Sequence, residues 1–344
     1  MTDVDHTAIR ALPKVELHVH VESCLSEQRV EALARDAGVP MLRPRGELYR
    51  YTTLADFLAT YEWWCDLLRT PEIAEQLAYD TAAYFGEEGV VYAELLTGPR
   101  YWTHVRWNEL IPALDRGLER AHADGHADVR LVPSISREQS PEWAMELVEW
   151  IGAGNAPRVV GLGLDGNEEL LGRTSPKFEA AFARAGELGL GRTAHAGESS
   201  GPEGVLDALD FLKLDRVDHG VRAIEDPALV ERLAAEGVTL NVCPTSNVIT
   251  GLYPRVAEHP VDRLVAAGVP VTVNSDDPMS MELSLNSELA DTASAFGWGM
   301  GELVGVTRTA IDATFCDAAR KDELHAALDA HVAAHAADPA ASAS

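Results

Sequence analysis

The sequence predicts a single (β/α)8 barrel with a helical insertion after its first strand. Short apolar segments typical of buried parallel strands recur eight times along the chain, and helical patterns separate them. The length of 344 residues suits one such barrel. The sequence has no internal repeat and no linker that would divide it. We therefore expect one domain over residues 1–332.

Helices are expected between the strands, and the first of them illustrates the pattern. Ser26 suits a helix N-cap, apolar residues follow at helical spacing through residue 37, and Gly38 suits the end of a helix. Pro202–Leu212 has the same character, with proline in the first turn. The segments expected as strands are, in chain order, Val15–His20, Val90–Leu96, Val129–Ile135, Val159–Leu164, Arg192–His195, Arg216–His219, Thr239–Cys243 and Val271–Asn274.

The connection between the first two strands is too long for a simple crossover helix. Residues 22–89 are rich in aromatic side chains and are expected to form an insertion above the C-terminal mouth of the barrel. One interpretation is an amphipathic helix that packs against its own core. The other is an apolar lid, formed by Phe57, Leu58 and Tyr61, over a flat ring. Residues 333–344 are of low complexity and are expected to be disordered.

The charge of the chain limits its partners. Its 55 acidic and 28 basic residues give a formal net charge of −27. Such a surface repels nucleic acid, anionic membranes and multiply phosphorylated substrates, so a neutral small molecule is the expected ligand. The four cysteines are widely spaced and form no CxxC pair, and the N-terminus carries no apolar leader. These features are typical of a cytoplasmic enzyme.

Metal-ligand residue types stand at the ends of several predicted strands. His18 and His20 are two residues apart on the first strand and therefore share a face. His195 ends the fifth predicted strand, and Asp276 follows the eighth. Each alone has an ordinary structural explanation, but the C-terminal ends of barrel strands meet at one mouth. Three imidazoles and one carboxylate suit a single Zn²⁺ with water in an open position.

Further acid–base groups occupy the same strand ends. A bound zinc ion makes a water nucleophile available at neutral pH. Glu198 is within reach to donate a proton to a ring nitrogen, which makes an aromatic C=N carbon electrophilic. His219 is placed either to accept the proton of the attacking water or to orient that water, and Asp277 to hydrogen-bond a second ring nitrogen. These roles are a hypothesis based on position along the strands.

The motifs PKVELHVH, TAHAGES, RVDHG, CPTSN and VNSDDP resemble the adenosine/adenine deaminase family of the amidohydrolase superfamily, in family order. The resemblance extends from Leu12 to about Arg320. It implies a (β/α)8 barrel, one zinc ion per chain and hydrolytic deamination of a 6-aminopurine with release of ammonia. By position the resemblance implies zinc ligands at His18, His20, His195 and Asp276. It implies that Glu198 donates a proton to purine N1 and that His219 activates the attacking water. It also implies a contact from Asp277 to N7 and from the backbone N–H of Gly166 to N3.

The branch within the family is less sharply defined by the motifs. Glu22 follows His20 by two, which resembles the HxHxEG pattern of adenine deaminases, and we count Glu22 among the predicted substrate-binding residues. The segment CPTSNVITG instead resembles relatives that deaminate adenosine or aminodeoxyfutalosine. Departures from the family pattern occur at Ser23–Cys24, at Leu96 and at Pro278–Glu282. Adenine, adenosine and a related adenine nucleoside all stay open as substrates.

Two other functions are possible for a barrel with these residues. A binuclear amidohydrolase acting on another amine or amide usually needs a bridging carboxylated lysine after the fourth strand, where this chain reads GLGLDG. A catalytically silent purine-binding barrel would have no reason to keep a complete ligand set and both acid–base groups. The cytidine deaminase type of zinc enzyme is excluded because it needs a PCxxC motif beside its HxE motif, and this chain contains no PCxxC.

Overall fold

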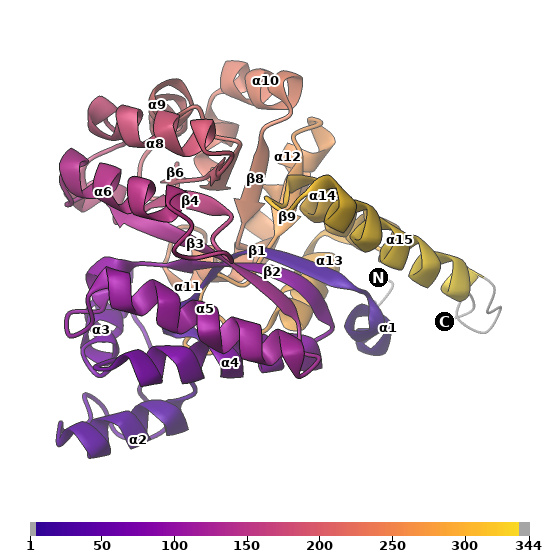
Figure 1. Cartoon of the computed structure of the whole chain (residues 1–344). Coiled ribbons are helices and arrows are strands. Elements are labelled where there is room, and N and C mark those ends of the chain that lie inside the picture. The colour runs from indigo at the N-terminus through magenta and orange to yellow at the C-terminus, as the bar shows by residue number, and fades with distance from the viewer. Residues whose placement is uncertain (1–4, 337–344) are drawn as a thin grey trace.

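Parallel strands form the centre of the molecule in the computed structural model, which describes residues 5–336. The strands are β1 Lys14–His20, β2 Val90–Thr97, β3 Asp128–Ser136, β4 Gly161–Asp165, β5 Gly191–Arg192, β6 His195–Ala196, β7 Arg216–His219, β8 Thr239–Val242 and β9 Val271–Val273. They pair in the orders β1-β2-β3-β4-β5 and β6-β7-β8-β9, and helices surround them (Figure 1). The predicted TIM-type barrel is confirmed.

The predicted strand Arg192–His195 is split into β5 and β6 because the chain changes its pairing partner there. Thr193 still exchanges backbone hydrogen bonds with Leu162 and Leu164 of β4. The carbonyl of Ala194 already accepts from Asp218 of β7. Residues 191–196 therefore join the two sheets.

The ring is closed between the first and last strands. The N–H of His20 donates to the carbonyl of Asp276 at 2.9 Å, and the N–H of Asp276 donates to the carbonyl of His18 at 3.0 Å. A parallel bridge between Val19 and Asp276 results. The hydrogen bonds that complete the barrel thus hold Asp276 between two histidines of β1.

Helices follow the strands as a barrel requires, with bounds that agree with the sequence pattern. Ser26 caps α2 by accepting from the N–H of Arg29, and Gly38 ends that helix in the left-handed region. The described α-helices are α1 His6–Ala11, α2 Glu27–Ala37, α3 Leu54–Cys65, α4 Pro71–Glu87, α5 Trp107–Ala123, α6 Pro141–Gly152, α7 Glu168–Leu171, α8 Glu179–Glu187, α9 Pro202–Leu212, α10 Pro227–Glu236, α11 Pro244–Ile249, α12 Val261–Ala266, α13 Leu285–Phe296, α14 Met300–Ala313 and α15 Ala318–Ala336. Short 3-10 helices are η1 Val21–Ser23, η2 Pro99–Tyr101, η3 Pro176–Phe178, η4 Val221–Glu225 and η5 Val256–Glu258.

The long connection after β1 contains η1, α2, α3 and α4. Helix α4 packs against β2 and α5 and so acts as an ordinary barrel helix, whereas α2 lies at the periphery (Figure 1). At the other end of the chain, α15 runs through Ala336, so the disorder expected from residue 333 does not begin before residue 337. Residues 337–344 of that predicted tail lie outside the described part. Between residues 5 and 336, none of the helices is both long and apolar enough to cross a membrane.

Close packing of α4 on α5 generates a first prediction. A Cβ at Gly117 would lie 2.1 Å from the carbonyl oxygen of Glu75 and 3.0 Å from Cβ of Ala78. Because backbone atoms have to move, Gly117→Ala should lower the free energy of unfolding by about 1–3 kcal/mol. Gly305→Ala on α14 is the control, because nothing lies within 4 Å of its added Cβ.

Urea denaturation of the two variants measures the difference. Gly305→Ala should leave stability unchanged or raise it by up to about 1 kcal/mol, since alanine is the better helix former. Equal effects of the two substitutions would show that the α4–α5 contact is looser than described.

Candidate active site

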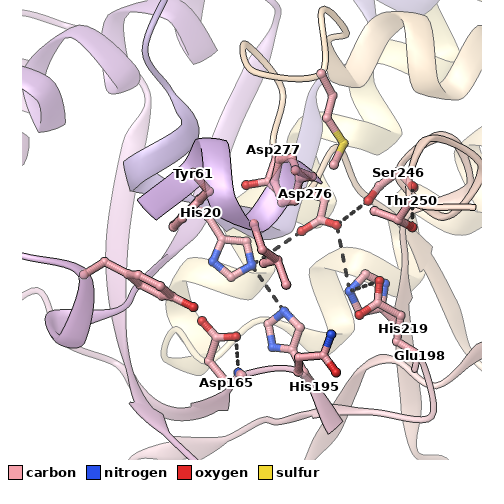
Figure 2. A pocket seen from close by; sticks show the side chains of 16 residues that line it. His20, Tyr61, Asp165, His195, Glu198, His219, Ser246, Thr250, Asp276 and Asp277 are labelled. Atoms are coloured by element: carbon pink, nitrogen blue, oxygen red, sulfur yellow. Dashed lines mark hydrogen bonds and ion pairs between the residues drawn. The ribbon is translucent and has the colours of Figure 1, made fainter. Parts of the chain in front are cut away.

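The four predicted metal ligands come together at the C-terminal mouth of the barrel. His18 and His20 end β1, His195 begins β6, and Asp276 follows β9. One ligand atom of each lies within 4.8 Å of those of the others. Nε2 of His18 is 3.1 Å from Oδ1 of Asp276, and Nε2 of His20 is 3.2 Å from Nε2 of His195. Figure 2 shows His20, His195 and Asp276 directed at one point.

The chemistry of this cluster fits a zinc ion. Both ring nitrogens of His18 are buried and have no hydrogen-bond partner. Leaving buried polar atoms unpaired is costly, whereas coordination to a cation would satisfy them. Burial lowers the pKa of His20, which keeps its imidazole in the neutral form that ligates metals. Three nitrogens and one carboxylate oxygen form a typical zinc donor set.

Two residues of the site have an unusual backbone. Asp276 has φ of 62° and His219 has φ of 61°, in the left-handed region that residues other than glycine rarely occupy. Such conformations cost about 1–3 kcal/mol each and persist where surrounding structure imposes them. For Asp276 the two hydrogen bonds to β1 impose it. With this backbone conformation the side chains of Asp276 and His219 both line the pocket at the mouth.

A further layer of polar residues orients the ligands. The carboxylate of Asp218 lies 3.4 Å from Nδ1 of His18 and accepts from Nδ2 of Asn241 at 2.8 Å. The hydroxyl of Ser246 donates to Oδ2 of Asp276 at 2.6 Å. These contacts orient His18 and Asp276. In the sequence, Asp218 and Ser246 stand within the motifs RVDHG and CPTSN, and the position of Asp218 at the end of a predicted strand was the available signal.

The buried carboxyl groups differ in protonation. Burial raises the pKa of Glu198 to about 8, and the Asp276 charge adds to the effect. Burial, reinforced by the adjacent Asp276 carboxylate, also raises the pKa of Asp277 well above its usual range. Burial by itself raises the pKa of Asp276, but His18 and the other imidazoles around it lower that pKa well below its ordinary value. Two proton donors therefore flank one ionised carboxylate.

His219 stands beside these groups. Its Nε2 is 3.8 Å from Oε1 of Glu198 and 3.9 Å from Oδ2 of Asp276. Burial lowers the pKa of His219 well below its usual value, so the imidazole is neutral. The predicted catalytic pair Glu198 and His219 is thus assembled next to the predicted metal ligands.

The predicted metal ligands His20, His195 and Asp276 line an open pocket with about 590 Å³ of empty space. Phe57, Leu58 and Tyr61 of α3 form part of its wall. The complete lining is His20, Phe57, Leu58, Tyr61, Tyr101, Asp165, Gly166, Asn167, His195, Glu198, His219, Ser246, Thr250, Asp276, Asp277 and Met281.

Gly166 lies in the pocket wall, but its backbone N–H donates to the carboxylate of Asp165. The N–H group predicted to contact a purine is therefore already engaged. Asp165 itself ends β4 and lines the pocket. Asp165 is not among the predicted site residues, although its place at a strand end in GLGLDG is the same signal that identifies the others.

Glu22 is not placed in the pocket. Its side chain is fully buried, because η1 begins directly after β1 and turns the residue away from the mouth. Oε1 accepts hydrogen bonds from Thr97 Oγ1, the N–H of Gly98 and Trp102 Nε1 at 2.8–2.9 Å. Oε2 accepts from the hydroxyl of Tyr61 at 3.3 Å. Glu22 therefore ties α3 to the end of β2 and supports the pocket wall from behind.

The other residues that depart from the family pattern also differ in whether they line the pocket. Ser23 and Cys24 are buried and bond to the carbonyl of His20, and Leu96 is buried in β2. None of these three lines the pocket, whereas Met281 of the segment 278–282 does.

The surroundings of Glu22 generate a second prediction. Glu22→Gln leaves the donors at Oε1 with an amide oxygen, a weaker acceptor than a carboxylate oxygen, and turns an N–H₂ toward the Tyr61 hydroxyl, which must then accept instead of donate. The free energy of unfolding should fall by about 1–3 kcal/mol. Glu62→Gln on the exposed face of α3 is the matched control and should change stability by less than about 0.5 kcal/mol.

Chemical denaturation of both glutamine variants provides the measurement. A Glu22→Gln protein as stable as Glu62→Gln would contradict the role of this carboxylate as a buried acceptor.

Comparison with known proteins places the chain in a family. The profile of the adenosine deaminase family matches residues 13–331. An adenine deaminase of Rhizobium etli is 39% identical over 323 residues, which cover 92% of this chain and 99% of that protein. An aminodeoxyfutalosine deaminase of Acidothermus cellulolyticus is 37% identical over 306 residues, 85% of each chain.

Solved structures agree. An adenine deaminase from Arthrobacter aurescens superposes with a TM-score of 0.87 at 31% identity, covering 94% of this chain and all of that one. An amidohydrolase from Burkholderia ambifaria with bound Zn gives 0.88 at 29% identity, over 98% and 96% of the chains. Arabidopsis ADAL complexed with GMP gives 0.83 at 26% identity, over 94% and 98%. The chain belongs to the adenosine deaminase family of the amidohydrolase fold and is a hydrolytic deaminase.

Proposed function

We propose that this protein is a zinc-dependent deaminase that converts an uncharged 6-aminopurine, either the base or a nucleoside, into the 6-oxopurine and ammonia. One observation carries the proposal. The cluster of His18, His20, His195 and Asp276 opens into the same pocket as the buried acids Glu198 and Asp277. The relatives named adenine deaminase and aminodeoxyfutalosine deaminase support a purine substrate.

Each group of residues in the site has a separate role in the proposed hydrolysis. A zinc ion held by the four ligands would make water nucleophilic at neutral pH. Glu198, protonated because its pKa is raised, donates a proton to ring nitrogen N1 and makes C6 electrophilic. Asp277, also protonated, donates to N7, which is an acceptor. Oxygen from water replaces the amino group, which leaves as ammonia.

The proposed single metal follows from the donor set. Strand β4 ends in Asp165, and no lysine is present there to carry the carboxylate bridge of a binuclear centre.

The walls of the pocket favour an uncharged ligand. Phe57, Leu58, Tyr61 and Met281 offer apolar surface to a flat ring. No lysine or arginine is among the described lining residues, whereas four carboxyl groups are. A phosphate group would leave water without finding a cationic side chain among these residues, which disfavours its entry. This separates the protein from ADAL, whose solved complex contains GMP.

The acid role of Glu198 predicts a defect in turnover without loss of metal. Glu198→Gln should keep zinc and lose at least about a hundredfold in kcat, because general acid catalysis contributes that much or more. The wild-type kcat should fall as the pH rises through about 8, where this carboxyl ionises, and the variant should lack that dependence. Steady-state kinetics with elemental analysis provides the measurement.

His18→Ala is the control for this experiment, because it should lose zinc and activity together. Normal turnover in Glu198→Gln would mean that another group donates the proton.

The absence of lysine and arginine from the described pocket lining predicts discrimination against nucleotides. Adenine, adenosine, deoxyadenosine, aminodeoxyfutalosine and AMP are compared by the loss of absorbance on deamination. The value of kcat/KM for AMP should be at least about a hundredfold below that of the best uncharged substrate. Comparable values for AMP and adenosine would contradict an uncharged substrate, and ammonia from none of the five would contradict the proposed function.

A further inference from the structure

A backbone group sets the direction of a buried hydrogen-bond chain behind the catalytic residues. The N–H of Val261 donates to Nδ1 of His259 at 3.2 Å. A backbone N–H can only donate, so Nδ1 of His259 is an unprotonated acceptor. Burial lowers the pKa of His259 to about 3, so its imidazole is neutral. The single ring proton of His259 is therefore on Nε2.

The next link is the side-chain amide of Asn247. Nε2 of His259 lies 3.2 Å from Oδ1 of Asn247, and the proton on Nε2 makes this a donation to the amide oxygen. The amide N–H₂ of Asn247 must then point the other way. It lies 3.4 Å from Oε1 of Glu198 and 3.4 Å from Nδ1 of His219. His259 is 2% exposed and Asn247 is fully buried, so water does not offer either residue an alternative partner.

The opposite arrangement is disfavoured at every link. If the amide of Asn247 were rotated, its N–H₂ would face the N–H of His259. If His259 changed tautomer to relieve that contact, its Nδ1–H would face the N–H of Val261. The backbone N–H of Val261 thus fixes the donor-to-acceptor direction of every hydrogen bond in this series.

We propose that Asn247 and His259 are positioning residues that set the proton arrangement of the catalytic pair, an inference that rests on the proposed function. Because Oε1 of Glu198 accepts from Asn247, the acidic proton of Glu198 is placed on Oε2. Because Nδ1 of His219 accepts the second N–H, the proton of neutral His219 is on Nε2, the nitrogen that faces Asp276 and Glu198.

This polarity distinguishes between the two roles open to His219. A ring that carries its proton on Nε2 presents a donor to the site, and it orients the attacking water instead of accepting its proton. The pair also accounts for part of the CPTSN motif that the catalytic roles left unused. Asn247 lies on α11 at the mouth and His259 directly follows η5 behind it, so a residue that does not line the pocket influences a proton inside it.

Histidine tautomers of the zinc-loaded wild-type enzyme test the proposal directly. Long-range ¹H–¹⁵N correlation of protein labelled with ¹⁵N-histidine distinguishes a protonated Nε2 from a protonated Nδ1, and His259→Gln and His219→Gln assign the two signals. We expect Nε2–H for both His259 and His219. A proton on Nδ1 of either ring overturns the proposal. This measurement needs no substrate, so it stays decisive even if no purine is deaminated and the proposed function fails.

Kinetics of paired variants supply the second test. His259→Gln retains a donor for the amide oxygen and should keep kcat within about threefold of wild type. His259→Phe keeps the ring packed against Tyr253 but donates nothing. It should lower kcat about 10- to 100-fold, as expected for loss of an orienting partner, with zinc content unchanged and KM within about threefold. Asn247→Asp removes both donations and should behave like His259→Phe.

Val230→Ala, in the buried face of α10 and away from the site, controls for general destabilisation and should leave kcat and the tautomer signals unchanged. A folded His259→Phe or Asn247→Asp enzyme with wild-type kcat overturns the proposal. If His259→Phe does not fold, the wild-type tautomers and the kcat of His259→Gln decide the question.

Discussion

The pairing of Asp276 with β1 is the constraint on which this molecule depends. Two backbone hydrogen bonds close the barrel and, in the same few atoms, set a carboxylate between His18 and His20. The left-handed backbone of Asp276 is the local cost of that arrangement. Barrel closure and assembly of the metal ligands are therefore one event, because a displaced Asp276 would open the ring and separate the donors together.

Burial gives chemically similar carboxyl groups different tasks. Asp276 stays ionised because imidazoles surround it, whereas Asp277 and Glu198 keep their protons because they are buried near that negative charge. A hydrolytic deaminase needs both kinds at once: an anion to hold a cation and neutral acids to donate to ring nitrogens. The proposed series of hydrogen bonds from Val261 through His259 to Asn247 also sets which atom of Glu198 and of His219 carries a proton.

The pocket wall depends on a carboxylate that never meets the ligand. The carboxylate of Glu22 accepts hydrogen bonds from α3 and from residues at and after the end of β2. One donor is the hydroxyl of Tyr61, whose side chain lines the pocket. The relatives share the barrel over nearly their whole length, yet they include an adenine deaminase, an aminodeoxyfutalosine deaminase and a complex with GMP. In this chain the described pocket lining has four carboxyl groups and no lysine or arginine.

The sequence by itself determined which segments form the parallel strands, apart from the division of residues 192–195 between β5 and β6, and it predicted the four metal ligands and the catalytic pair. Strand ends in a parallel barrel converge by geometry, so residue type and position suffice to predict them. Only the tertiary structure decided that Glu22 faces inward, that the N–H of Gly166 is engaged, and that Asp165, Asp218, Asn247 and His259 surround the site. These features depend on where a 3-10 turn directs a side chain and on which buried groups meet across segments far apart in the chain, and no local pattern records such contacts.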